Sequence, residues 1–151
     1  MTLRNRRVLV GLDPSGRSEV VADADDMATA YPPTGVAIQE VWWQARIPAQ
    51  LDDDGARSGP IGLAAPAGGA VVRILTVPPT PTETAVDLHF DDSMHVLTMT
   101  EGQLDIVLEV GEVTLSAGDS IVLPASMHDL RNTSGSPATF VYTSFPLQRH
   151  S

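Results

Sequence analysis

Apolar and polar positions alternate along this chain in short runs separated by turn-forming residues. Two runs, 8–12 and 18–22, flank Asp13, Pro14 and Gly16, which predicts a β-hairpin. Proline presets φ for a turn and glycine accepts positive φ, so the turn chemistry is present in the sequence. The next segment, 23–28, has the composition of a short helical turn that the prolines after Tyr31 end.

The same pattern of short runs continues to the end of the chain. We predict strands at 36–43, 70–77, 85–90, 94–100, 103–110, 113–115, 120–123 and 138–145. The residues at 50–69 are rich in Asp, Gly and Pro and predict a long surface loop, mobile or acting as a lid. Short, evenly spaced strands with almost no helical periodicity favour an all-β sandwich or barrel.

Composition narrows the class of protein. A chain of 151 residues is expected to form one domain, over 1–151. The absence of cysteine excludes disulfides and thiolate sites. A net charge of −10 argues against nucleic acid or a membrane as partner. The apolar run after the basic start is too short for a secretory signal, so we expect a cytoplasmic protein.

Three of the four histidines, His89, His95 and His128, fall in one stretch, and His150 lies in the tail. Histidines are more often surface or core residues than ligands, but three imidazoles suit Zn, Fe, Ni or Mn. A single strand through 89–95 would put His89 and His95 on one face. A turn at 91–93 would put them on successive strands, where they can still meet.

The segment from His89 to residue 145 resembles the cupins, which are small double-stranded β-helix barrels. Gly102 matches the last glycine of the first cupin motif. Counting back from it, His95 stands at the glutamate position, Asp91 at the second histidine and His89 at the first. The hairpin at 6–17 is similar to the opening of a subgroup of small bacterial cupins.

The second cupin motif is also present. Gly118 and Pro124 have the family spacing, Ser126 replaces a glycine, and His128 comes one residue early, with Asn132 following at the expected interval.

The resemblance implies an all-β cupin barrel with an added N-terminal β-hairpin. The core barrel would span about 70–147, with the hairpin and first strands at 6–48 and the loop at 50–69. It also implies a divalent metal held by His89, Asp91, His95 and His128, three imidazoles and one carboxylate with their positions exchanged. Asp91 is either a ligand or a turn residue that caps its own backbone. Gly102, Gly118, Pro124 and Asn132 would serve turn geometry.

A mostly apolar pocket should surround these residues. Candidate substrate-binding side chains are Trp42, Met99, Met127 and Phe140, all of which could equally be core packing. Adjacent Trp42 and Trp43 must face opposite sides of a strand. Arg73 is either an inward anchor for a carboxylate or carbonyl of the ligand, or an outward residue in a salt bridge.

Three functions stay open. The first is a metal-dependent enzyme for cyclisation, isomerisation or dehydration of a small apolar molecule, as in natural-product pathways, with His95 or Asp91 as general base if either is not a ligand. The second is a dioxygenase using Fe or Ni. The third is a non-enzymatic barrel that binds a small molecule. The resemblance further implies a homodimer.

Overall fold

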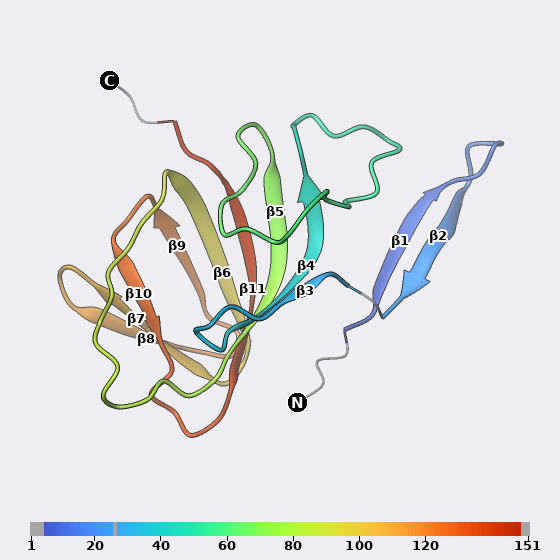
Figure 1. Cartoon of the computed structure of the whole chain (residues 1–151). Helices are drawn as coiled ribbons and strands as arrows, with labels where there is room; N and C mark the ends of the chain where they lie inside the picture. The colour runs from blue at the N-terminus through green and yellow to red at the C-terminus, as the bar shows by residue number, and fades with distance from the viewer. Residues whose placement is uncertain (1–4, 26, 149–151) are drawn as a thin grey trace.

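The computed structural model describes residues 5–25 and 27–148, which fold into three antiparallel sheets (Figure 1). The strands are β1 Arg7–Leu12, β2 Ser18–Ala24, β3 Thr29–Ala30, β4 Ala37–Gln44, β5 Ala70–Val77, β6 Ser93–Glu101, β7 Gln103–Leu108, β8 Glu112–Ser116, β9 Ser120–Pro124, β10 His128–Arg131 and β11 Ala138–Pro146. The described residues include no helix capable of crossing a membrane. The all-β prediction is confirmed.

The largest sheet has six strands in the order β3-β4-β5-β11-β6-β9. Along each strand, inward-facing and outward-facing side chains alternate, because successive residues point to opposite faces of the sheet. In β6, for example, every second residue is buried, and these positions define the inner face of the sheet: Ser93, His95, Leu97 and Met99. The smaller sheet, β10-β7-β8, lies opposite that inner face, so the two sheets form a barrel with open sides (Figure 1).

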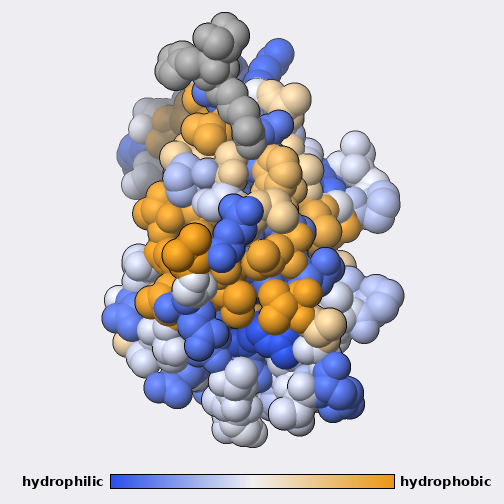
Figure 2. All heavy atoms as spheres, turned by 90° about the vertical axis from the view of Figure 1, so that its left-hand side faces the viewer, coloured by the Kyte–Doolittle hydropathy of each residue, from blue (hydrophilic) through white to orange (hydrophobic). Residues whose placement is uncertain are grey.

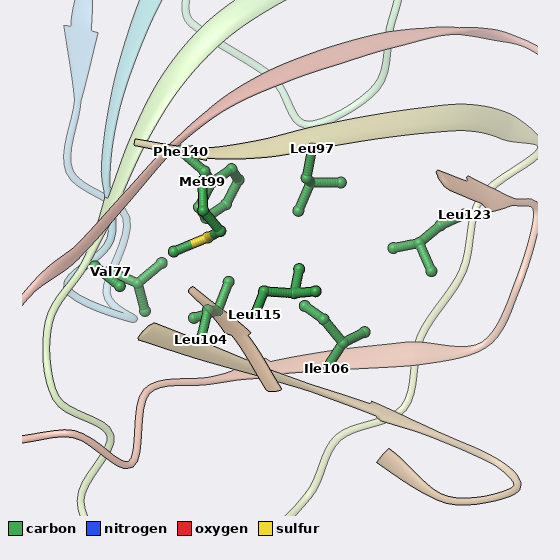
Figure 3. Close-up of a cluster of buried hydrophobic side chains, with 9 residues drawn as sticks. Val77, Leu97, Met99, Leu104, Ile106, Leu115, Leu123 and Phe140 are labelled. Carbon is green, nitrogen blue, oxygen red and sulfur yellow. The ribbon is translucent and has the colours of Figure 1, made fainter. Parts of the chain in front are cut away.

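The hydrophobic core fills the space between these two sheets at one end of the barrel. Figure 3 shows Leu97, Met99 and Phe140 of the large sheet pointing toward side chains of β7 and β8. The opposing side chains are Leu104, Ile106 and Leu115. Aliphatic and aromatic side chains removed from water in this way supply the main free energy that holds the two sheets together.

The predicted N-terminal hairpin is confirmed. β1 pairs with β2 in antiparallel register, from Arg7 opposite Ala24 to Leu12 opposite Ser18. The carboxylate of Asp13 accepts hydrogen bonds from the backbone N–H groups of Ser15 and Arg17, which closes the turn. Figure 1 shows this hairpin standing to one side of the barrel, beyond β4.

Two predicted turn glycines adopt the positive φ that their motif positions require. Gly102, between β6 and β7, has φ 76°, and Gly118, before β9, has φ 95°. At Gly102 a Cβ atom would also lie 2.7 Å from the carbonyl oxygen of Pro137, so only glycine fits between these two chain segments.

The predicted strand at 85–90 is wrong. Only His89 pairs there, through an isolated bridge to His128, and the rest of the segment has no strand partner. Pro78, Pro79 and Pro81 precede it and lack the N–H group that a strand donates. Residues 128–131, which were expected only to carry a motif, form strand β10.

The predicted helical turn at 23–28 is also wrong for the residues that the structure describes. Asp23 and Ala24 extend β2, and Asp25, Met27 and Ala28 are not helical; Asp26 lies outside the described residues. Pairing with β1 supplies Asp23 and Ala24 with interstrand partners, which a single turn of helix could not match.

Candidate metal centre

The structure brings three histidines from separate places in the sequence into contact. His89 and His128 exchange two backbone hydrogen bonds, each 3.0 Å long, and their ring centroids are 4.9 Å apart. His95 comes from the inner face of β6, and its ring centroid lies 5.8 Å from that of His128. His128 therefore neighbours both of the other histidines. His150 lies outside the described residues.

The rings of His89 and His128 are oriented by the backbone. Nδ1 of His89 lies 2.9 Å from the carbonyl oxygen of Asp87, and Nδ1 of His128 lies 2.7 Å from that of Ser126. A carbonyl oxygen only accepts, so Nδ1 of each ring carries the proton. Nε2 of each neutral ring then presents a lone pair, which is the arrangement of histidines that bind metals.

His95 is buried, with 4% of its surface exposed, and both of its ring nitrogens have polar neighbours. Nδ1 lies 2.7 Å from the hydroxyl of Tyr142 and 3.1 Å from that of Ser144. Burial lowers the pKa of the His95 imidazole, the neighbouring His128 and His89 act in the same direction, and the Asp91 carboxylate opposes them. Burial likewise raises the pKa of the Tyr142 hydroxyl.

Asp91 approaches the other nitrogen of His95 without forming an aligned hydrogen bond. Its Oδ1 lies 2.9 Å from Nε2, yet this oxygen is buried and has no hydrogen-bond partner among the described residues. Two ligands at about 2.0–2.2 Å from one ion and at right angles to each other are about 3 Å apart. A carboxylate oxygen and an imidazole nitrogen in this arrangement fit two neighbouring ligands of a cation.

The four predicted ligands do not all converge on one position that a single metal ion could occupy. Across residues 5–25 and 27–148, no group of three or more His, Cys, Asp or Glu is arranged as a metal site. His89 is exposed, and its ring packs against that of His128. The donor chemistry of the four predicted ligands therefore suits a divalent metal, while their spacing supports only the pair Asp91 and His95 directly.

The predicted substrate-binding residues fall in different places. Met99 and Phe140 are 1% and 0% exposed and belong to the core. Met127 lines a shallow surface depression beside His128, together with Phe90, Leu108, Glu109, Val110, Ala125 and Ser126. Figure 2 views the molecule from the side that bears the β7–β8 turn and shows apolar side chains gathered across it.

Trp42 does not face the barrel interior. A β-bulge between Glu40 and Trp42 shifts the alternation of β4 by one residue, so that Trp43 pairs with the inward Val71 and Trp42 with Val72. The Trp42 ring packs on Gly55, where a Cβ atom would lie 2.2 Å from the ring. Trp43, and not Trp42, is the tryptophan on the inner face.

Arg73 lies on the inner face of β5 and is 2% exposed. Arg73 combines parts of the two expectations: it points inward, and it also forms a salt bridge in which its Nη2 lies 3.0 Å from Glu40 Oε2. Its remaining contacts are with the carbonyl oxygens of Gly62 and Leu63 in the loop after β4.

Sequence reasoning missed Tyr142 and Ser144, which contact His95, and Arg57, which joins the Arg73 ion pair. The pattern of β11 could have indicated that Tyr142 and Ser144 lie on the same side as Phe140, because the three residues share one face of the strand. Their nearness to His95 depends on the pairing of β11 with β6, which the sequence does not reveal.

Comparisons with known proteins find similarity in the fold but not in the sequence. No protein-family model matches the chain, and no curated protein matches its sequence. Solved structures do match. An RmlC-like cupin from Shewanella frigidimarina has a TM-score of 0.56 and 12% identity, covering 83% of this chain and 88% of that one.

Two further solved structures give the same result. KdgF from Halomonas sp. has a TM-score of 0.54 and 12% identity, covering 80% of this chain and 86% of that one. The cupin domain of Cnp3 from Schizosaccharomyces pombe has a TM-score of 0.55 and 8% identity, covering 95% and 89%. Identities this low establish the fold alone. Together with the two facing sheets and the strand order, they show that this chain has the fold of a small cupin domain.

Proposed function

We propose that this protein is a metal-dependent enzyme that acts on a small, largely apolar organic molecule by cyclisation, isomerisation or dehydration. The divalent cation would be held by His89, Asp91, His95 and His128. The observation that carries the proposal is the close approach of two atoms of the kinds that bind divalent metals: Asp91 Oδ1, a buried oxygen, lies 2.9 Å from His95 Nε2 without an aligned hydrogen bond. A cation bound by both atoms would satisfy this buried carboxylate oxygen, which lacks an aligned donor.

A divalent cation at this place would polarise a carbonyl of the substrate as a Lewis acid. The chain itself supplies orientation and proton transfer. The Tyr142 hydroxyl, 2.7 Å from Nδ1, fixes the ring of His95. Should only one of His95 and Asp91 bind the cation, the other would be the general base, because the two side chains lie 2.9 Å apart. The depression lined by Phe90, Leu108 and Met127 would contact the apolar body of the substrate.

Oxygen-dependent chemistry uses the same kinds of ligand. Fe or Ni bound by imidazoles and a carboxylate with open positions would give a dioxygenase. The two functions differ in the metal and in their use of oxygen. Metal analysis of the purified protein and oxygen uptake by the Fe²⁺-loaded protein with candidate substrates therefore distinguish them.

The metal site is tested by calorimetric titration of chelator-treated protein with Zn²⁺, Mn²⁺ and Ni²⁺. We expect one saturable site per chain for at least one of these ions. Asp91→Asn and His128→Ala should each weaken it at least tenfold, as expected for loss of a ligand. The matched control is Glu101→Gln, which removes one negative charge from the exposed end of β6.

The control matters because a chain with net charge −10 attracts cations without a specific site. If Asp91→Asn and Glu101→Gln weaken binding equally, the cation is held only by the general field of the protein. The proposed metal centre is then wrong, and the non-enzymatic binding barrel becomes the better function.

The partners that we propose are a small-molecule substrate and a second copy of this chain. The net charge argues against nucleic acid and against anionic membrane surfaces, because both repel an acidic protein.

A further inference from the structure

Two arginines share one carboxylate beneath the loop that follows β4. Arg57 Nε lies 2.6 Å from Glu40 Oε1, and Arg73 Nη2 lies 3.0 Å from Glu40 Oε2. The three side chains are 9%, 2% and 3% exposed, in the order Arg57, Arg73 and Glu40. Glu40 is the one carboxylate bonded to either guanidinium among the described residues. The group therefore holds two positive charges and one negative charge away from water.

The excess positive charge is unusual in so acidic a chain. A buried charge without a counter-ion is strongly unfavourable, so a site of this kind favours an anion. One donor also lacks an acceptor: Arg57 Nη2 is buried and has no hydrogen-bond partner among the described residues. The guanidinium lies 3.9 Å above the ring of Trp43, which holds it in place on the inner face of β4.

The other donors of the two arginines bond to backbone carbonyls of residues 58–64, which we call the strap. Arg73 Nη1 lies 3.1 Å from the carbonyl oxygen of Leu63, and Nη2 lies 2.6 Å from that of Gly62. Arg57 Nη1 donates to the carbonyl of Pro60. The strap contains no charged side chain. Neutral carbonyls thus occupy positions where a carboxylate would bond more strongly, because it adds the attraction of opposite charges and matches the guanidinium fork with two parallel hydrogen bonds.

The arginines lie beside the candidate metal centre. Arg73 is the cross-strand partner of Tyr142 on the inner face, and the Tyr142 hydroxyl contacts His95. Side chains opposite each other on paired strands are about 5 Å apart at Cβ. A molecule anchored at the arginines would therefore extend toward His95 without leaving the inner face of the sheet.

We propose that Arg57 and Arg73 bind the carboxylate of an organic anion, which displaces the strap carbonyls of Gly62 and Leu63. A carboxylate matches the planar fork of a guanidinium and makes the buried group electrically neutral. The identification of this anion as the substrate rests on the proposed function; the binding of a carboxylate does not. The structure described is then the closed form of the strap, and the anion opens it.

The test compares benzoate with benzamide, which have the same shape but differ in charge, by calorimetry on the full-length protein as purified. We expect saturable binding of benzoate, and affinity for benzamide at least tenfold weaker. Arg57→Gln should weaken benzoate at least tenfold and still fold, because Glu40 keeps its bond to Arg73. Arg46→Gln, an exposed arginine at the start of the same loop, is the matched control and should bind as the wild type does.

A second measurement follows the strap itself. Hydrogen–deuterium exchange in a peptide covering 58–64 should increase when benzoate is added and stay unchanged with benzamide. Equal binding of benzoate and benzamide, equal effects of Arg57→Gln and Arg46→Gln, or no saturable binding would each overturn the proposal.

The same variants separate this proposal from the metal centre. His128→Ala should leave benzoate affinity within about twofold, and Arg57→Gln should leave cation binding within about twofold, as expected for sites with no shared contacts. Loss of cation binding alone therefore contradicts the proposed function, and loss of the charge preference for benzoate alone contradicts the arginine site.

Discussion

At the scale of the residue, the sequence is compatible with two roles for Phe140: lining a pocket or packing in the core. Its position two residues before Tyr142 puts it on the same face of β11 as the side chains near the histidines. Its exposed fraction of 0% and its packing against Met99 and Leu104 place it in the core. An aromatic side chain on the inner face of a barrel lines a pocket only where the core does not reach it, and here the core does.

Replacing Phe140 with alanine should therefore reduce stability and not binding. We expect Phe140→Ala to lower the free energy of unfolding by about 3–5 kcal/mol, through lost burial and the remaining cavity. Urea unfolding followed by circular dichroism measures this. Val110→Ala, at a position 91% exposed, should change it by less than about 0.5 kcal/mol. A stable Phe140→Ala protein with weakened ligand binding would instead assign Phe140 to the pocket.

At the scale of the element, the loop between β4 and β5 is fixed at its end by a close backbone approach. A Cβ atom at Gly69 would lie 1.8 Å from the carbonyl oxygen of Gln44, the last residue of β4. Gly68, its neighbour, has nothing within 4 Å of the same position. The absence of a side chain at Gly69 thus lets the loop return directly to β5 beside the strand that it left.

These adjacent glycines make a matched pair of variants. Gly69→Ala should destabilise the fold by at least about 1–3 kcal/mol, because backbone atoms of the two segments must separate. Gly68→Ala should be close to neutral. Thermal unfolding of both variants tests this, and equal midpoints would show that β4 and β5 tolerate a wider separation than the structure gives them.

At the scale of the whole molecule, the outer face of the six-stranded sheet lacks charge. The middle of this face carries only apolar side chains and threonines, at Val72, Ile74, Val96, Thr98, Val122, Val141 and Thr143. A sheet face in contact with water normally carries polar and charged residues. The hairpin beyond β4 adds further exposed apolar side chains, at Val8, Val10, Leu12, Val20 and Val21.

An uncharged surface is where two copies of an acidic chain can approach without opposing their net charges. We therefore expect a dimer through the outer face and the hairpin. Light scattering at micromolar concentration should give twice the 16.0 kDa of one chain. Val141→Lys should yield the single chain, because two buried like charges would face each other across the symmetry axis. Val113→Lys, on β8 of the other sheet, should remain dimeric; a wild-type mass of one chain would contradict the dimer.

The sequence by itself determined the elements whose cause is local. The β1–β2 turn follows from Asp13 and Gly16, and the glycine at 102 follows from a turn that needs positive φ. Alternation placed β6 and β11 correctly, because a strand with one buried face repeats every two residues. The predicted cupin fold followed from these strands and the motif spacing.

Only the tertiary structure decided which residues meet. The bulge in β4 exchanged the faces of Trp42 and Trp43, and a bulge depends on the partner strand as well as on local sequence. His89 lies beside His128 because of one bridge between distant segments, not because 85–90 is a strand. Arg57 comes from a loop whose path is set by its contacts. Pairing and loop closure join residues far apart in the chain, so alternation along one strand carries no record of them.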